Sequence, residues 1–169
     1  MITGLKVTMQ EELDLNAQLT EATLVEYKDD NQIDLVKGEG YTFFFDKQEL
    51  FFEEADVLSA DVAYVAEMLV EAKVIAPDVT QVLVLDEVEL LSKDVETVLP
   101  AFLMKLDDYC ARYHINYITF MHAAIYKGEG SEESYLKLFK DLGYESTFDQ
   151  DNGHHILYRD TRVNAPYHA

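Results

Sequence analysis

The histidines are the first candidates for chemistry, because imidazole nitrogens bind metals and move protons near neutral pH. His154 and His155 are adjacent in the segment "HHILYRD". Neighbours in a strand point to opposite faces, so these two rings cannot chelate one metal ion together. His114 and His122 stand alone in the sequence, a setting more typical of capping or surface histidines than of metal ligands. The histidines therefore predict no metal site.

The remaining reactive side chains also have simple structural interpretations. Cys110 is the single cysteine, which excludes an intramolecular disulfide, and it falls on an apolar helical stripe that predicts a buried, inert thiol. Glu132 and Glu133 directly follow Ser131 at the start of a predicted helix. Carboxylates interact favourably with the dipole at that end, and we interpret both as capping residues.

The charge balance limits the partners. The 169 residues include 33 Asp and Glu against 13 Lys and Arg, for a net charge of −20. Such a chain repels nucleic acids and anionic membranes, and it attracts basic partners. The start, "MITGLKVTMQEELDL", lacks the regions of a secretion signal, and no apolar run reaches the roughly 18 residues of a membrane span. We therefore expect a cytoplasmic protein that binds neither membranes nor nucleic acids.

The N-terminal part predicts an antiparallel meander. Residues 2–8 alternate like a strand, and 10–20 predict a short helix. Four short strands follow, separated by the turns "KDDNQ", "KGEG" and "DKQ": "ATLVEY", "IDLV", "YTFFF" and "ELFF". We expect Gly38 and Gly40 to supply positive φ in a turn. The last hairpin would carry phenylalanines on both faces, one in the core and the other available to form a homodimer.

The second part alternates helices and strands. Ser59 predicts the N-cap of a helix over residues 60–73, and "TQVLVLDEV" predicts a strand buried on both faces. A helix with one buried stripe follows, with Pro100 in its first turn. The strand "NYITFMHA", a helix from Ser131 to about Leu142, and a hairpin of "YESTF" and "HHILYRD" complete the chain. The order predicts an α/β fold of mixed α+β type: a meander, then βαβαββ, in a single domain 1–169. Residues 1–75 either complete that domain or form an accessory layer on the core, residues 80–160.

Residues 80–160 resemble the GNAT N-acetyltransferase superfamily. "LMKLDDYCARYHINYITFMHA" is similar to the long helix and next strand of that family. "SYLKLFKDLGYE" resembles its last helix, which closes on Leu-Gly and an aromatic residue, and "HHILYRD" resembles its last strand. The resemblance implies a GNAT-like fold and acetyl-CoA as the family cofactor. The helix at 60–73 departs from the family pattern, which runs from a hairpin straight into the central strand.

The resemblance also locates the cofactor loop, and its chemistry is altered here. The family holds a pyrophosphate with backbone amides of the pattern Arg/Gln-x-x-Gly-x-Gly/Ala. The matching residues place Asp94 at the basic position and Thr97 and Leu99 at the glycine positions, and Val84 on the central strand completes the cofactor set. Each carboxylate near a phosphate costs on the order of 1 kcal/mol even when hydrated. The loop therefore predicts that no cofactor binds.

The family's general acid is altered as well. Many members protonate the leaving thiolate with a tyrosine in the last helix, and Phe139 occupies that position here. Tyr135 precedes it by four residues, about 6 Å along the helix axis, and is the one candidate catalytic residue.

Three functions are compatible with these features. The first is a catalytically degenerate acetyltransferase homologue that acts as a binding or regulatory module for a protein or a basic small molecule. The second is an active acetyl-CoA-dependent N-acetyltransferase with a non-standard loop. The third is an acidic decoy or immunity-type protein that covers a basic partner.

Overall fold

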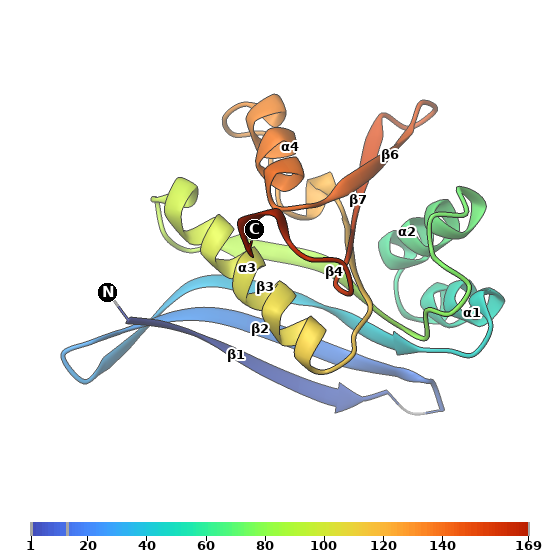
Figure 1. Cartoon of the computed structure of the whole chain (residues 1–169), viewed down its shortest axis with the longest axis horizontal. Helices are drawn as coiled ribbons and strands as arrows, with labels where there is room; N and C mark the ends of the chain where they lie inside the picture. The colour runs from blue at the N-terminus through green and yellow to red at the C-terminus, as the bar shows by residue number, and fades with distance from the viewer. Residues whose placement is uncertain (1, 13, 169) are drawn as a thin grey trace.

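The computed structural model describes residues 2–12 and 14–168 and contains one mixed sheet, shown in Figure 1. Its seven strands follow the order β1-β2-β3-β4-β5-β7-β6, and only β4 and β5 pair in parallel. The strands are β1 (Ile2–Glu11), β2 (Ala17–Lys28), β3 (Asn31–Phe44), β4 (Gln81–Leu90), β5 (Tyr117–Met121), β6 (Glu145–Asp149) and β7 (His154–Asp160). The predicted mixed α/β class is confirmed.

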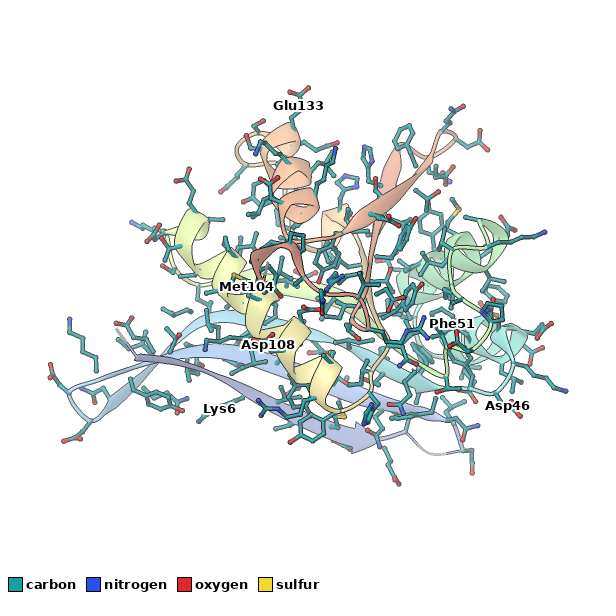
Figure 2. All side chains as sticks on the ribbon, viewed as in Figure 1. Lys6, Asp46, Phe51, Met104, Asp108 and Glu133 are labelled. Atoms are coloured by element: carbon teal, nitrogen blue, oxygen red, sulfur yellow. The ribbon has the colours of Figure 1, made fainter. Side chains whose placement is uncertain are left out.

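Helices cover both faces of the sheet. The α-helices are α1 (Gln48–Leu58), α2 (Ala60–Glu71), α3 (Val95–Arg112) and α4 (Glu132–Asp141), and short 3-10 turns span His122–Ala124 and Pro166–His168. The α3–α4 face buries Phe102, Phe120 and Phe139, whereas the α1–α2 face buries Phe43 and Phe51. In Figure 2, Phe51 lies among the packed side chains and Glu133 points outward from the tip of α4.

The meander predicted for the N-terminal part is wrong in its boundaries. The described residues of 10–20 form no helix, because β1 continues to Glu11 and β2 begins at Ala17. "IDLV", "KGEG" and "YTFF" form one strand, β3, so Gly38 and Gly40 lie inside a strand and not in a turn. A Cβ on Gly40 would lie 1.9 Å from the carbonyl oxygen of Val84. The glycine is required for close approach of two backbones, not for a positive φ.

The predicted last hairpin does not form either. "ELFF" begins α1, where Phe51 and Ala55 are buried one turn apart. The ring of Phe51 lies 5.1 Å from that of Phe43 and 5.2 Å from that of Phe45. These aromatic residues thus build the core between α1 and the sheet, and the hairpin that suggested a dimer surface is absent from residues 41–52.

The second half follows the prediction closely. α2 begins after Ser59, whose hydroxyl accepts from the amide of Val62 at 3.4 Å. Similarly, Ser131 caps α4 by accepting from the amide of Ser134 at 3.2 Å. Pro100 is the exception, because α3 starts at Val95 and the proline lies inside the helix, beyond the first turn. Since proline has no N–H, it cannot donate to the carbonyl of Glu96.

Candidate functional site

The pairing between the two parallel strands ends next to the start of α3. β4 and β5 pair from Val82–Tyr117 to Leu85–Phe120. Beyond this point β5 ends and the chain enters the 3-10 turn, whereas β4 continues to Leu90 paired with β3 alone among the described strands. A β-bulge at the same level leaves Asp86 without a partner in the β3 register. Beyond Leu85, β4 therefore has none of the described strands paired on its β5 side, although the 3-10 turn stays close to it.

Two adjoining cavities lie near this end of β4, and we call them together the α3–α4 cleft. The larger, about 740 Å³, lies between the start of α3 and α4, and the other, about 600 Å³, follows the end of β4. Both are lined by Lys93, Val95, Glu129 and Tyr135. Each cavity by itself is within the roughly 300–1,000 Å³ of pockets that bind small molecules.

The cleft carries an excess of negative charge. Three lysines line it together with six carboxylates, namely Glu87, Glu89, Asp94, Glu96, Glu129 and Asp141. Lys127 Nζ lies 2.7 Å from Glu87 Oε1, and Lys137 Nζ lies 2.7 Å from Asp141 Oδ2. These contacts neutralise two carboxylates, which leaves Lys93 to offset the other four. The lining therefore favours a cationic ligand over an anionic one.

The acidic surface continues onto the other face of the sheet, the one that α3 does not cover. Glu21, Glu39 and Glu87 are directly opposite one another on β2, β3 and β4. They line a hollow of about 420 Å³ together with Glu89 and several other residues. Like charges at directly opposite positions destabilise a sheet. Since Glu87 and Glu89 line both this hollow and the cleft, one acidic surface runs around the end of β4.

The structure brings together two of the five residues that the sequence indicated. Tyr135 lines both cavities and Asp94 lines the larger one. Thr97 is exposed on the first turn of α3, outside the residues that line the cleft. Leu99 and Val84 are fully buried. Leu99 lies on the side of α3 that faces the core, and Val84 lies on the α1–α2 face of the sheet. The glycine positions of the family loop thus lie within a helix.

Several amides at the start of α3 already have partners. The N–H groups of Thr97 and Val98 donate to the carbonyl of Asp94 at 3.2 and 3.0 Å. Asp94 itself is the N-cap, and its amide donates to Ser92 Oγ at 3.2 Å. Asp94 and Glu96 also place two carboxylates at the end of the helix whose partial charge is positive. This end of α3 offers little electrostatic attraction for a phosphate.

Tyr135 has the environment of a protonated phenol. Its ring packs edge-on against Tyr126 at 5.2 Å, and the Tyr126 hydroxyl donates to the carbonyl of Gly130 at 3.0 Å. Burial, followed by the charge of Glu129, raises the pKa of Tyr135. Phe139, by contrast, is fully buried with its ring 5.1 Å from that of Phe120. The position at which the family has its tyrosine therefore faces the core here.

A cluster of histidines was not predicted. His122 is only 7% exposed, and its Nδ1 accepts from the amide of His155 at 3.0 Å. The His122 ring lies 5.7 Å from that of His154 and 5.6 Å from that of His155. Glu132 lies between two of the rings, 3.8 Å from His122 Nε2 and 4.0 Å from His155 Nε2. The interpretations of His122 as a surface or capping residue and of Glu132 as a cap were thus incomplete, because only tertiary packing brings β7 and α4 to the end of β5.

Other expectations about reactive groups can also be compared with the structure. His154 packs near Tyr64 of α2 and His155 against Phe148 of β6, as expected for neighbours on opposite faces. Cys110 is a buried free thiol, and burial raises its pKa. Across residues 2–12 and 14–168, no three His, Cys, Asp or Glu side chains are placed to hold a metal ion.

A scan against models of known protein families finds no match for the chain, and a search of curated proteins finds none either. None of the helices in the described ranges has the length and apolar composition needed to cross a bilayer.

Proposed function

We propose that this chain is an acetyltransferase-like scaffold without catalytic activity, and that its α3–α4 cleft binds a basic segment of a partner protein. The observation that carries the proposal is the excess of carboxylates in the cleft that opens beside β4. In the GNAT superfamily, which residues 80–160 resemble, the corresponding region holds the pyrophosphate of acetyl-CoA.

Three features of the cleft support a cationic ligand over that cofactor. The amides of Thr97 and Val98 in the first turn of α3 donate to the carbonyl of Asp94. The two helical positions that correspond to glycines carry Thr97 and the buried Leu99. The charges of Asp94 and Glu96 offset the partial positive charge of the helix end. A lysine or arginine side chain meets none of these obstacles and finds several carboxylates within the same cleft.

Calorimetry with two ligands tests the proposal. We expect a lysine-rich peptide to bind with an affinity that falls as salt rises, and acetyl-CoA to give no binding heat at concentrations up to about 1 mM. The variant Glu96→Gln/Glu129→Gln should weaken the peptide, whereas Thr97→Ala, an exposed neutral change outside the cleft lining, should not. Acetyl-CoA binding tighter than about 100 μM, roughly 5.5 kcal/mol, would refute the proposal.

One observation favours a second candidate function, an active N-acetyltransferase. Tyr135 lies where the two cavities meet, and a tyrosine hydroxyl, with an ordinary pKa of about 10, is protonated at neutral pH, as a general acid requires. Under this hypothesis a basic amine would be the acceptor, and Tyr135→Phe should lower turnover of acetyl-CoA with a polyamine at least about tenfold. Unchanged turnover in that variant would remove Tyr135 from the mechanism.

A further inference from the structure

The two edges of the sheet differ in how well they are protected. Free edge strands are usually short, charged, interrupted by proline or bulged, because their unpaired N–H and C=O groups otherwise pair with another chain. β6 fits this description, with five residues that begin with Glu145 and end with Asp149. β1 has ten residues, no proline, and an uninterrupted register with β2. Its two charged side chains, Lys6 and Glu11, are spread over ten residues, so β1 is the less protected of the two edges.

The side chains of β1 are divided into two faces. Leu5, Val7 and Met9 are partly buried and pack against the core under α3. Lys6, Thr8 and Gln10 alternate with them and are exposed on the opposite face; Figure 2 labels Lys6 beside β1. A strand added beside β1 would therefore extend an apolar surface on one face and a polar one on the other.

We propose that β1 pairs antiparallel with β1 of a second copy of this chain, with the twofold axis at Val7. In this register Val7 is opposite Val7 of the partner subunit, and Leu5 is opposite Met9 of the partner subunit. Lys6 is opposite Thr8 of the partner subunit. Apolar side chains thus meet only apolar ones, and nine residues of each strand, 3–11, take part.

Neighbouring registers are less favourable. An axis at Lys6 would place the two Lys6 ammoniums directly opposite each other, and like charges there destabilise a strand pair. An axis at Thr8 would place Leu5 opposite Glu11 of the partner subunit and would pair fewer residues. A shift by one position would direct the apolar side chains of the two strands to opposite faces. The charge and apolar pattern of β1 therefore selects the register at Val7.

The helices leave room for this arrangement. α3 packs against β1, β2 and β3, and Figure 1 shows it lying across these strands. If α3 is centred on β2, it is separated from its symmetry mate by the spacings from β2 to β1, from β1 to the partner's β1, and from there to the partner's β2. Three spacings of about 4.8 Å place the two helix midpoints roughly 14 Å apart. Packed helices come within about 8–10 Å of each other, so at this spacing the midpoints of the two copies of α3 do not collide.

Substitutions at Thr8 should change dimer affinity and monomer stability in opposite directions. Thr8 is exposed and is opposite Glu21 in its own chain. Thr8→Lys places like charges opposite each other twice in the dimer, so its dimer dissociation constant should rise roughly tenfold. Thr8→Glu creates two opposite-charge pairs and should lower that constant several-fold. Monomer stability should move the other way, because Glu21 attracts the lysine and repels the glutamate.

Sedimentation equilibrium of the full chain measures these dissociation constants at about 0.15 M and about 0.5 M salt. Each copy carries a net charge of −20, so salt should strengthen pairing by screening the repulsion between the two copies. A wild-type chain that stays monomeric at about 100 μM in both salts overturns the proposal. Dimers in which Thr8→Lys and Thr8→Glu shift the constant in the same direction also overturn it.

Cross-linking tests the register. The paired Cβ atoms at the axis are about 5 Å apart, so Val7→Cys should be joined by a short bismaleimide, and the buried Cys110 should not react. Thr3→Cys is the control, because eight residues of about 3.3 Å separate Thr3 from Thr3 of the partner subunit along the strands. Cross-linking of Thr3→Cys but not of Val7→Cys would overturn the register.

Discussion

Placing a glycine at position 99 should strongly destabilise the protein and not create a cofactor loop. Leu99 is fully buried in the core under α3. Truncation of a buried leucine to alanine costs about 2–5 kcal/mol, and a glycine inside a helix costs about 1 kcal/mol more. Leu99→Gly should therefore lower the free energy of unfolding by about 3–6 kcal/mol, which is much of the roughly 5–15 kcal/mol that stabilises a typical domain.

Urea denaturation measures this loss. With a slope of about 2 kcal/mol per molar, the midpoint for Leu99→Gly should fall by roughly 1.5–3 M. Thr97→Gly is the matched control, because it changes the other glycine position on the exposed side of the first turn and should cost less than about 0.5 kcal/mol. Equal midpoints for the two variants would show that position 99 is not packed, and the loop would again be a candidate for holding a pyrophosphate.

Three further predictions concern the sheet and its titrating groups. Gly40→Ala should destabilise the chain by about 1–3 kcal/mol or more, because its Cβ would overlap the Val84 carbonyl, whereas Gly4→Ala meets nothing closer than 3.4 Å and should be nearly neutral in the same urea titration. Burial lowers the pKa of His122, so the unfolded state binds the proton more tightly than the folded state does. The free energy of unfolding should therefore decrease as the pH falls from about 7 to about 5. His122→Gln should flatten this decrease when unfolding is measured across that pH range. The hydrogen bond from Tyr64 lowers the pKa of Asp149. The stability that this bond contributes is fully present above the ordinary carboxyl pKa of about 3.9, and it is lost as the pH falls through the lowered pKa. Tyr64→Phe should raise the Asp149 pKa toward its ordinary value in an NMR titration of the carboxyl carbon, and an unchanged value would show that the bond does not form in solution.

Local patterns predicted the second half of the chain well. Ser59 and Ser131 cap α2 and α4 as the sequence indicated, and the apolar run of β4 is buried on both faces. These signals depend on residues within one or two turns of each other, so no distant contact is needed to interpret them. The same kind of reasoning failed at Gly38 and Gly40, because a glycine needed for close backbone approach and a glycine needed for a turn look alike in sequence.

The candidate site was predicted only in part. Asp94 and Tyr135 line one cleft, and the carboxylates of the segment 86–96 could be counted from the sequence alone. The burial of Leu99 depends on where α3 begins, and the sequence pattern does not locate that residue. The predicted position of Pro100 in the helix was wrong by about one turn for the same reason.

The sequence by itself determined the acidity of the protein, the mixed α/β class, and the helices and strands after residue 60. Charge is a sum over residues, and caps and periodicity are local properties. Only the tertiary structure decided that the pairing of β4 with β5 ends beside α3, that His122 meets His155 and Glu132, and that β1 lies at an edge of the sheet. Strand order and register are set by packing between residues far apart in the chain, and no short stretch of sequence encodes them.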